Sequence, residues 1–148
     1  MSIIEYFILK KEFLIEVSYE DSLKKLTTKA SGFTVDEMHY GKCKIVSDFS
    51  IGTAIINNYK SIPISTELSL LSINSSSVKV SLKTGPRIEI FIIMVIWVVL
   101  IFVQLISAEN IPWWVTLILF PTIFLFFHQV YRSQEKSLHQ KVENHLKS

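Results

Sequence analysis

Hydrophobic and polar residues follow two different rules along this chain of 148 residues. Up to Lys83 they mostly alternate, as in the stretch VKVSLK, and alternation of this kind predicts half-buried β-strands. After the segment TGPR the polar side chains almost disappear. Residues 90–106 contain one polar side chain, Gln104, and residues 111–127 contain only two threonines. The chain therefore joins a region with the pattern of a sheet to a region with the pattern of a membrane-spanning segment.

The two apolar runs are long enough to cross a lipid bilayer. Each has 17 residues, and an α-helix needs about 20 residues, flanks included, to span roughly 30 Å of hydrocarbon. Burial in a soluble core is the alternative, but residues 1–87 are too few to cover two such helices. The connection SAENIP is long enough only for a hairpin. We therefore predict a transmembrane hairpin over residues 87–131, with antiparallel helices at about 88–106 and 111–131.

Basic residues flank both ends of this hairpin, whereas its loop has none. They are Lys79, Lys83, Arg87, Arg132, Lys136, Lys141 and Lys147. Lysine and arginine close to a membrane helix resist translocation, so both termini should lie in the cytoplasm of a multi-pass inner-membrane protein. Trp113 and Trp114 then become anchors at the outer interface and Tyr131 an anchor at the inner one, since amphipathic rings prefer the headgroup level.

Residues 1–86 have the pattern of a small α+β domain. FLIEVSY (13–19) alternates and predicts a strand. SYEDSLKKLTTKASG predicts one short helix, with Ser18 and Asp21 spaced as a capping box and Gly32 as a stop. YGKCKIV, FSIGTAIIN, ELSLLSIN and VKVSLK then alternate again, and the Asn, Asp and Ser residues between them favour turns. We expect an antiparallel β-meander with the helix on one face, whereas residues 1–9 fit either a helix or a strand.

The last segment, residues 132–148, continues the second helix without a helix-breaking residue. Leu138, Val142 and either His145 or Leu146 follow Tyr131 at helical spacing, so one narrow apolar stripe faces a partner. Two to three heptads are marginal for an independent coiled coil. This favours packing on the front domain or along the lipid surface, with a self-association seam as the alternative.

Charge and chemistry-bearing residues restrict the function. Residues 1–87 carry 11 Lys or Arg and 9 Asp or Glu, without the strong basic face expected of a protein that binds a nucleic acid polymer. The single Cys43 fits a reducing cytoplasm, and its spacing from His39 allows a Cys-His pair, but only Asp36 and Glu37 are near enough in sequence to orient it. Cys-x-x-Cys spacing and Gly-rich phosphate loops are absent from the sequence. We therefore predict no catalytic residue, no metal and no cofactor.

Three polar features lie in the predicted hairpin. Glu89 and His128 fall at similar depth on the cytoplasmic side and form a candidate pair. Neither lies near the bilayer centre, so a wetted position in the headgroup zone is the favoured interpretation of both. Gln104 lies within reach of Thr116 or the tryptophan pair, where it would hold the helices together. Pro121 removes one backbone hydrogen bond midway along the second helix and predicts a kink.

The order of strand, helix, β-meander and hairpin comes with three characteristic stretches: VSYEDSLKKL, NYKSIPI and SSSVKVSLKTGP. Together they resemble a group of small bacterial membrane proteins of uncharacterised function. Members of that group carry a Tyr-Arg-Asn-Ser-type turn followed by a Pro, and here Tyr59, Lys60, Ser61 and Pro63 stand in its place. The resemblance implies an N-terminal α+β domain followed by a two-helix transmembrane hairpin, and it brings no activity with it.

These patterns predict a non-enzymatic protein that holds a cytoplasmic binding domain at the inner leaflet. Its expected contacts are the lipid bilayer and either a protein partner or a second copy of the chain. A pocket lined by Tyr40, Tyr59 and Lys60 would favour the alternative. In that alternative the domain recognises a small ligand such as a nucleotide and gates a membrane effector, for example in antiviral defence. A toxin-immunity protein has the same sequence pattern.

Overall fold

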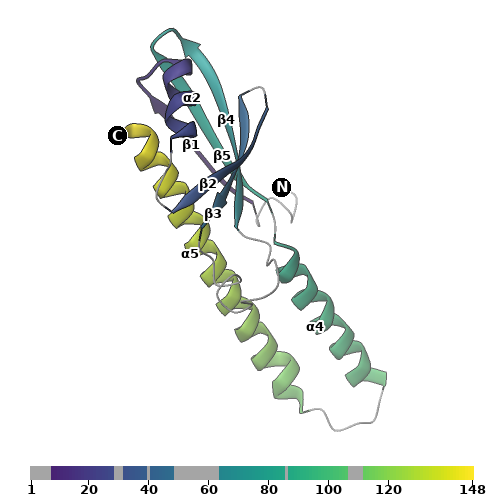
Figure 1. The fold of residues 1–148 in the computed structure, drawn as a ribbon. Helices are drawn as coiled ribbons and strands as arrows, with labels where there is room; N and C mark the ends of the chain where they lie inside the picture. Colours follow the sequence, from purple (N-terminus) through teal and green to yellow (C-terminus); the bar gives the residue numbers. More distant parts are fainter. Residues whose placement is uncertain (1–7, 29–31, 40, 49–63, 86, 107–111) are drawn as a thin grey trace. The chain divides into compact units, whose positions relative to one another are not determined.

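The structure is a computed structural model that describes residues 8–28, 32–39, 41–48, 64–85, 87–106 and 112–148. It is an α+β arrangement with an antiparallel sheet, one short helix and two long helices (Figure 1). The strands are β1 (Leu9–Ile15), β2 (Phe33–His39), β3 (Lys42–Ser47), β4 (Ser65–Asn74) and β5 (Ser77–Thr84). The helical elements are α2 (Tyr19–Thr27), α4 (Ile88–Ile106), the π-helix η1 (Val115–Leu119) and α5 (Phe120–Lys147).

The sheet has the strand order β1-β5-β4-β3-β2, and every neighbouring pair is antiparallel. Strands β3, β4 and β5 match three of the predicted meander strands, and β2 pairs with β3 at one edge of the sheet. Strand β1 lies at 9–15 instead of the predicted 13–19 and pairs with β5, with Phe13 opposite Val80. The predicted strand FSIGTAIIN falls at residues 49–57 and lies outside the described residues, as do residues 1–7.

Local side-chain hydrogen bonds cap the N-terminus of α2 and stabilise the β4–β5 turn. Ser18 caps the helix by accepting a hydrogen bond from the Asp21 backbone N–H at 3.2 Å, which confirms the predicted cap. The helix ends at Thr27, before the predicted stop at Gly32. In the β4–β5 turn the Asn74 side-chain oxygen accepts from the Ser76 backbone N–H at 3.2 Å, an arrangement that replaces a backbone turn bond.

Strand β2 was not predicted from the sequence. Its register against β3 shifts between Val35 and Glu37, so a β-bulge interrupts the alternation by which a strand is recognised. His39 is the last residue of this strand. The turn follows at Gly41, whose φ of 74° lies in the left-handed region that glycine tolerates best.

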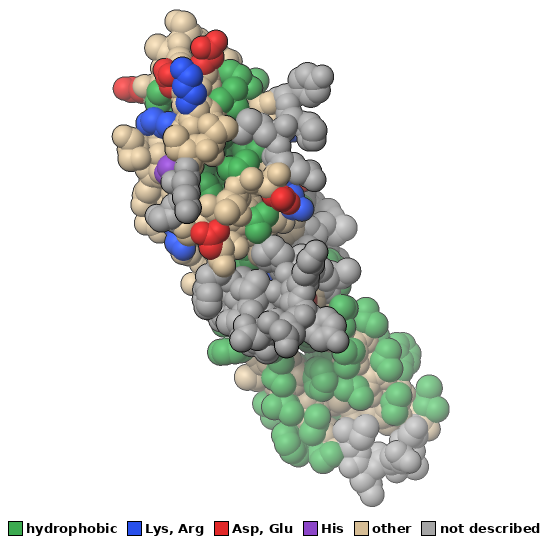
Figure 2. All heavy atoms as spheres, viewed as in Figure 1, with side chains coloured by type: hydrophobic (Ala, Val, Ile, Leu, Met, Phe, Trp, Pro, Cys, Tyr) green, Lys and Arg blue, Asp and Glu red, His purple; other side chains and the backbone are tan. Residues whose placement is uncertain are grey.

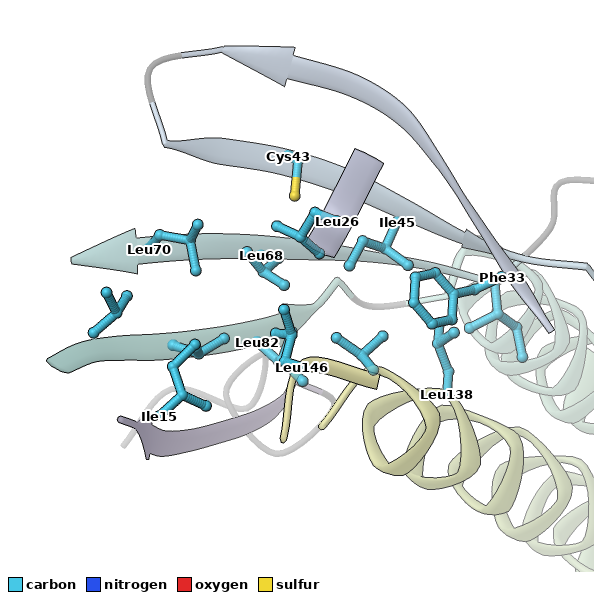
Figure 3. Close-up of a cluster of buried hydrophobic side chains, with 14 residues drawn as sticks. Ile15, Leu26, Phe33, Cys43, Ile45, Leu68, Leu70, Leu82, Leu138 and Leu146 are labelled. Atoms are coloured by element: carbon cyan, nitrogen blue, oxygen red, sulfur yellow. The ribbon is translucent and has the colours of Figure 1, made fainter. Parts of the chain in front are cut away.

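The end of α5 belongs to the core of the sheet domain. The chain divides into two compact units, residues 1–85 with 134–148 and residues 86–133, so the tail does not stand apart as a third segment. Figure 3 shows Leu138 and Leu146 pointing into a cluster of strand and α2 side chains. The buried members are Ile15, Leu26, Phe33, Cys43, Ile45, Ile64, Leu68, Leu70, Val78, Val80, Leu82, Leu138, Val142 and Leu146. The apolar stripe of the tail thus packs on the front domain, the first of the two packing modes that its sequence favours.

Polar contacts fix this helix end against α2 and β1. Lys25 donates from Nζ to the Leu146 carbonyl at 3.2 Å, and a His145 ring nitrogen lies 2.9 Å from the Lys25 carbonyl. Glu143 forms ion pairs with Lys11 of β1 and with Lys147 one turn further along α5. The hydrogen bonds from these two lysines hold the pKa of the Glu143 carboxyl below its usual value, so the contact persists at neutral pH.

A small polar cluster lies within the apolar core. The hydroxyl oxygens of Thr66 and Thr84 are 2.7 Å apart on neighbouring strands, and His139 Nε2 of α5 lies 2.8 Å from the Thr84 hydroxyl. All three side chains are buried. Hydrogen bonds form only at particular distances and angles, so these bonds fix the position of the α5 end along the sheet. Apolar contacts are less directional and do not fix it in this way.

The second unit is the helical hairpin. Its helices pass the length and hydropathy criteria for a membrane span over Glu89–Ile106 and Val115–Lys147. Only 11% of the first window and 6% of the second is buried, whereas the core helix of a soluble protein would be mostly buried. Figure 2 shows hydrophobic side chains gathered over this hairpin, while lysine, arginine and acidic side chains lie over the sheet domain.

The helices of the hairpin are joined by hydrogen bonds at Thr116. Its hydroxyl donates to Gln104 Oε1 at 2.7 Å, which confirms the predicted contact between these residues. Its carbonyl accepts from the Trp97 indole N–H at 2.7 Å. In an α-helix that carbonyl would accept from residue 120, but Phe120 donates to the Val115 carbonyl in the π-helical turn. Residue 121 is a proline without an N–H, so Trp97 provides the donor that the backbone does not.

Candidate functional site

One face of the sheet carries the core, and the opposite face is the candidate site. Burial alternates along β3, β4 and β5, so their buried residues point toward α2 and the end of α5. The alternate residues, which include Lys42, Glu67, Ser69 and Lys83, point the other way. Within the part of the chain that the structure describes, neither α2 nor the end of α5 packs on the face that carries these alternate residues. We call it the open face.

A concave region of about 490 Å³ lies on the open face. The described residues lining it are Lys42, Cys43, Lys44, Glu67, Leu68, Ser69, Ser81 and Lys83. Small serine side chains occupy its middle, where Ser69 is directly opposite Ser81 in the ladder, and longer charged side chains surround them. This difference in side-chain length makes the surface hollow at this point.

The charge of this hollow is mainly positive, with three lysines against one glutamate. Lys44 and Lys83 lie opposite Glu67 on the two neighbouring strands. At the margin Lys44 also lies 4.0 Å from Asp36, whereas Lys42 and Lys83 form no ion pair within the described residues. Ammonium groups and hydroxyls are hydrogen-bond donors suited to carboxylates and phosphates, so the hollow favours acidic ligands or acidic protein surfaces.

Apolar side chains adjoin the charged part of the open face. Leu14 on β1 and Leu71 on β4 both lie opposite Lys79 of β5, and both are exposed. Lys79 forms an ion pair with Glu12 at 2.7 Å, which fixes its ammonium group along the sheet. A basic hollow next to two exposed leucines combines the contacts that a protein interface uses.

The residues predicted to bind a ligand are not those that form the hollow. Tyr40, Tyr59 and Lys60 lie outside the described residues, so the structure does not test them. Sequence reasoning missed Lys42, Lys83 and their neighbours because they appear simply as the polar positions of alternating strands. The alternation assigns each to one face of its own strand, but only the strand order brings them together.

Several of the predicted membrane groups have contacts within the described residues. Glu89 forms an ion pair with Arg87 at 3.4 Å, while His128 stacks on the ring of Phe124 with 6.3 Å between centroids. The Arg87 guanidinium lies over the ring of Tyr131, 4.7 Å from its centroid. Trp113 and Trp114 are both exposed, as side chains inserted among lipid headgroups need to be.

Cys43 has the properties of a core residue. It is buried in the sheet, and burial raises the pKa of its thiol to about 11 from a usual value of 9.0. The side chain of His39 lies outside the described part of the structure, so the Cys-His geometry is untested. The thiolate is the nucleophile, and a thiol with a raised pKa forms very little of it near neutral pH.

We therefore expect alkylation of Cys43 by iodoacetamide at pH 8 to be at least about 100-fold slower in the folded chain than in urea, since two pKa units lower the thiolate fraction about 100-fold. Mass spectrometry of quenched samples measures both rates on the same single cysteine. Equal rates would show an accessible thiolate and would reopen the Cys-His hypothesis.

Among the residues that the structure describes, no group of three His, Cys, Asp or Glu side chains is arranged to hold a metal ion. Comparison with protein-family models, with curated proteins and with solved structures finds no match to this chain.

Proposed function

We propose that this chain is a non-enzymatic, two-span membrane protein that holds a binding domain at the cytoplasmic face of the inner membrane. The observation that carries the proposal is the contrast between the two units. The sheet domain closes its own core, whereas the hairpin leaves its apolar side chains exposed over two helices of membrane-spanning length. Such exposure is unfavourable in water and favourable in hydrocarbon.

The partner is a protein with an acidic surface, and it docks on the open face. The ammonium groups of Lys42 and Lys83, which form no ion pair with another described residue, complement carboxylates, and the exposed Leu14 and Leu71 supply apolar contact beside them. A small anionic ligand, such as a nucleotide, is the second candidate, because the hollow has a ligand-sized volume and is lined by lysine and serine donors.

Membrane location is tested by carbonate extraction of cell membranes that contain the full chain. We expect the chain to remain in the pellet, and its release into the supernatant would contradict the proposal. Protease added to inverted vesicles should reach both ends of the chain, because basic residues around the hairpin favour the cytoplasmic side for both termini.

Partner binding is tested with a photo-crosslinking amino acid at Ser81, in the middle of the open face, in intact cells. We expect one discrete protein adduct, which disappears when Lys42, Lys44 and Lys83 are all changed to Glu. The matched control places the same amino acid at Thr27, an exposed position on α2. If both positions give the same adducts, the open face is not the docking surface.

The ligand candidate is tested separately by thermal unfolding of the full chain in detergent with a panel of nucleotides. A ligand present at about 100 times its dissociation constant should add roughly 2.7 kcal/mol of stability. A saturable shift that the triple Lys→Glu variant loses would favour the small ligand over the protein partner. The full chain is needed because residues 134–148 complete the core.

A further inference from the structure

Arg87 is a buried cation whose hydrogen bonds are not completed by the residues that the structure describes. Only 9% of its side-chain surface is exposed, and its Nη2 atom is buried without a hydrogen-bond partner among the described residues. A guanidinium presents five donors in a planar fork, and leaving a charged donor unpaired is strongly unfavourable. A second group with acceptor oxygens is therefore expected at this position.

The groups in contact with Arg87 among the described residues do not satisfy Nη2. Glu89 Oε1 is 3.4 Å from Nη1, longer than the roughly 2.7–2.9 Å of a strong charge-assisted bond. Tyr131 covers one face of the guanidinium through a cation–π contact, which holds the plane but accepts no hydrogen bond from Nη2. The arginine is thus oriented by its neighbours more than it is neutralised by them.

The position of Arg87 in the hairpin identifies the acceptor. It immediately precedes α4, and Tyr131 follows the apolar part of α5, so both lie at the same end of the antiparallel hairpin. In the proposed membrane orientation this end is at the cytoplasmic headgroup level, where phosphodiester groups are the abundant anions. Arginine forks match phosphate oxygens in geometry and charge.

We propose that Arg87, held in place by Tyr131, binds the phosphate of a phospholipid headgroup of the cytoplasmic leaflet. The phosphate accepts from Nη2 and competes with Glu89 for the remaining guanidinium donors. The proposal rests on the membrane location proposed above and adds a defined lipid contact to it. The bound lipid anchors the start of α4 at the headgroup level, a few residues after the end of β5 in the sequence.

Lipid binding to the purified full chain tests this site. The chain is kept in maltoside micelles, which contain no phosphate, and dioleoylphosphatidylglycerol is titrated while retained lipid is counted by native mass spectrometry. We expect Arg87→Gln to weaken lipid binding about tenfold, because one charge-assisted hydrogen-bond set is lost. Glu89→Gln should tighten it several-fold, since a competing carboxylate is removed. Lys136→Gln, which makes the same change of charge at an exposed position, should leave it unchanged.

Two further probes separate the sources of the effect. Dioleoylglycerol, with the same acyl chains and no phosphate, should not replace the phospholipid, and inorganic phosphate should not compete with it. The proposal is overturned if Arg87→Gln binds phosphatidylglycerol within twofold of the natural chain, or if dioleoylglycerol binds equally well. It is also overturned if inorganic phosphate displaces the lipid, which would indicate a site for soluble phosphate. Equal weakening by the Arg87 and Glu89 variants would show only the loss of a structural ion pair.

Carbonate extraction keeps this inference distinct from the proposed function. Every variant should remain in the membrane pellet, because the apolar helices are intact. Release of the natural chain would contradict membrane location itself. Retention of all variants with Arg87-independent lipid binding would contradict only the headgroup site.

Discussion

Ending the chain at Ser133 should leave the sheet domain unfolded, although every strand is still present. The missing segment supplies Leu138, Val142 and Leu146, which are among the most buried side chains of the core. Replacing one fully buried leucine by alanine costs about 2–5 kcal/mol, and a small domain has about 5–15 kcal/mol in total. Loss of all three removes most or all of that stability and exposes the apolar face of the sheet.

Hydrogen exchange of the β4 and β5 amides, measured on the truncated and full chains in the same micelles, checks this expectation. A graded version changes only Leu138 and Leu146 to alanine and should weaken amide protection without shortening the chain. Its matched control changes Lys136, Gln140 and Asn144, which are exposed on the same helix, to alanine. Full amide protection in the truncated chain would show that the sheet domain is stable without α5.

Replacing Trp97 by Phe should destabilise the hairpin by roughly 1–2 kcal/mol, a large value for a single hydrogen bond within a membrane. The ring is largely kept, and what is lost is the indole N–H that reaches the Thr116 carbonyl. Neither Phe120, which bonds to Val115, nor Pro121 can take its place. In hydrocarbon no water is available to donate a hydrogen bond to the Thr116 carbonyl once the indole N–H is removed.

A double-mutant cycle with Pro121→Ala tests this account. Alanine at 121 restores a backbone N–H near the same carbonyl, so the Trp97→Phe effect should be smaller in that background. Stability is measured by unfolding in maltoside–SDS micelles, followed by the distance between spin labels at the exposed positions 99 and 117. Trp114→Phe is the control, because Trp114 is exposed and donates no hydrogen bond within the described residues. Strict additivity of the two changes would rule out the shared acceptor.

Local pattern was sufficient for much of the fold. The uninterrupted apolar runs predicted the hairpin helices, and α4 spans residues 88–106 as expected. Alternation predicted β3, β4 and β5, and the spacing of Ser18 and Asp21 predicted the start of α2. In each case the determining forces act within a few residues or along one element, so they can be read directly from the order of side chains.

The candidate site was less predictable than the elements that build it. Lys42, Ser69 and Lys83 meet only because β3, β4 and β5 lie side by side, and the pairing that joins them is not encoded in any one strand. Strand β2 was missed because its bulge disrupts the two-residue period. The residues favoured from the sequence, Tyr40, Tyr59 and Lys60, stay predictions.

The sequence by itself therefore determined β3, β4 and β5 and the two membrane-length helices, since hydrophobic period and length are properties of a single segment. Only the tertiary structure decided that β1 pairs with β5, that Leu138, Val142 and Leu146 complete the core, and that Trp97 satisfies Thr116. These contacts join residues far apart in the chain. Their partners are chosen by which buried surfaces and unpaired polar groups remain after the local elements have formed.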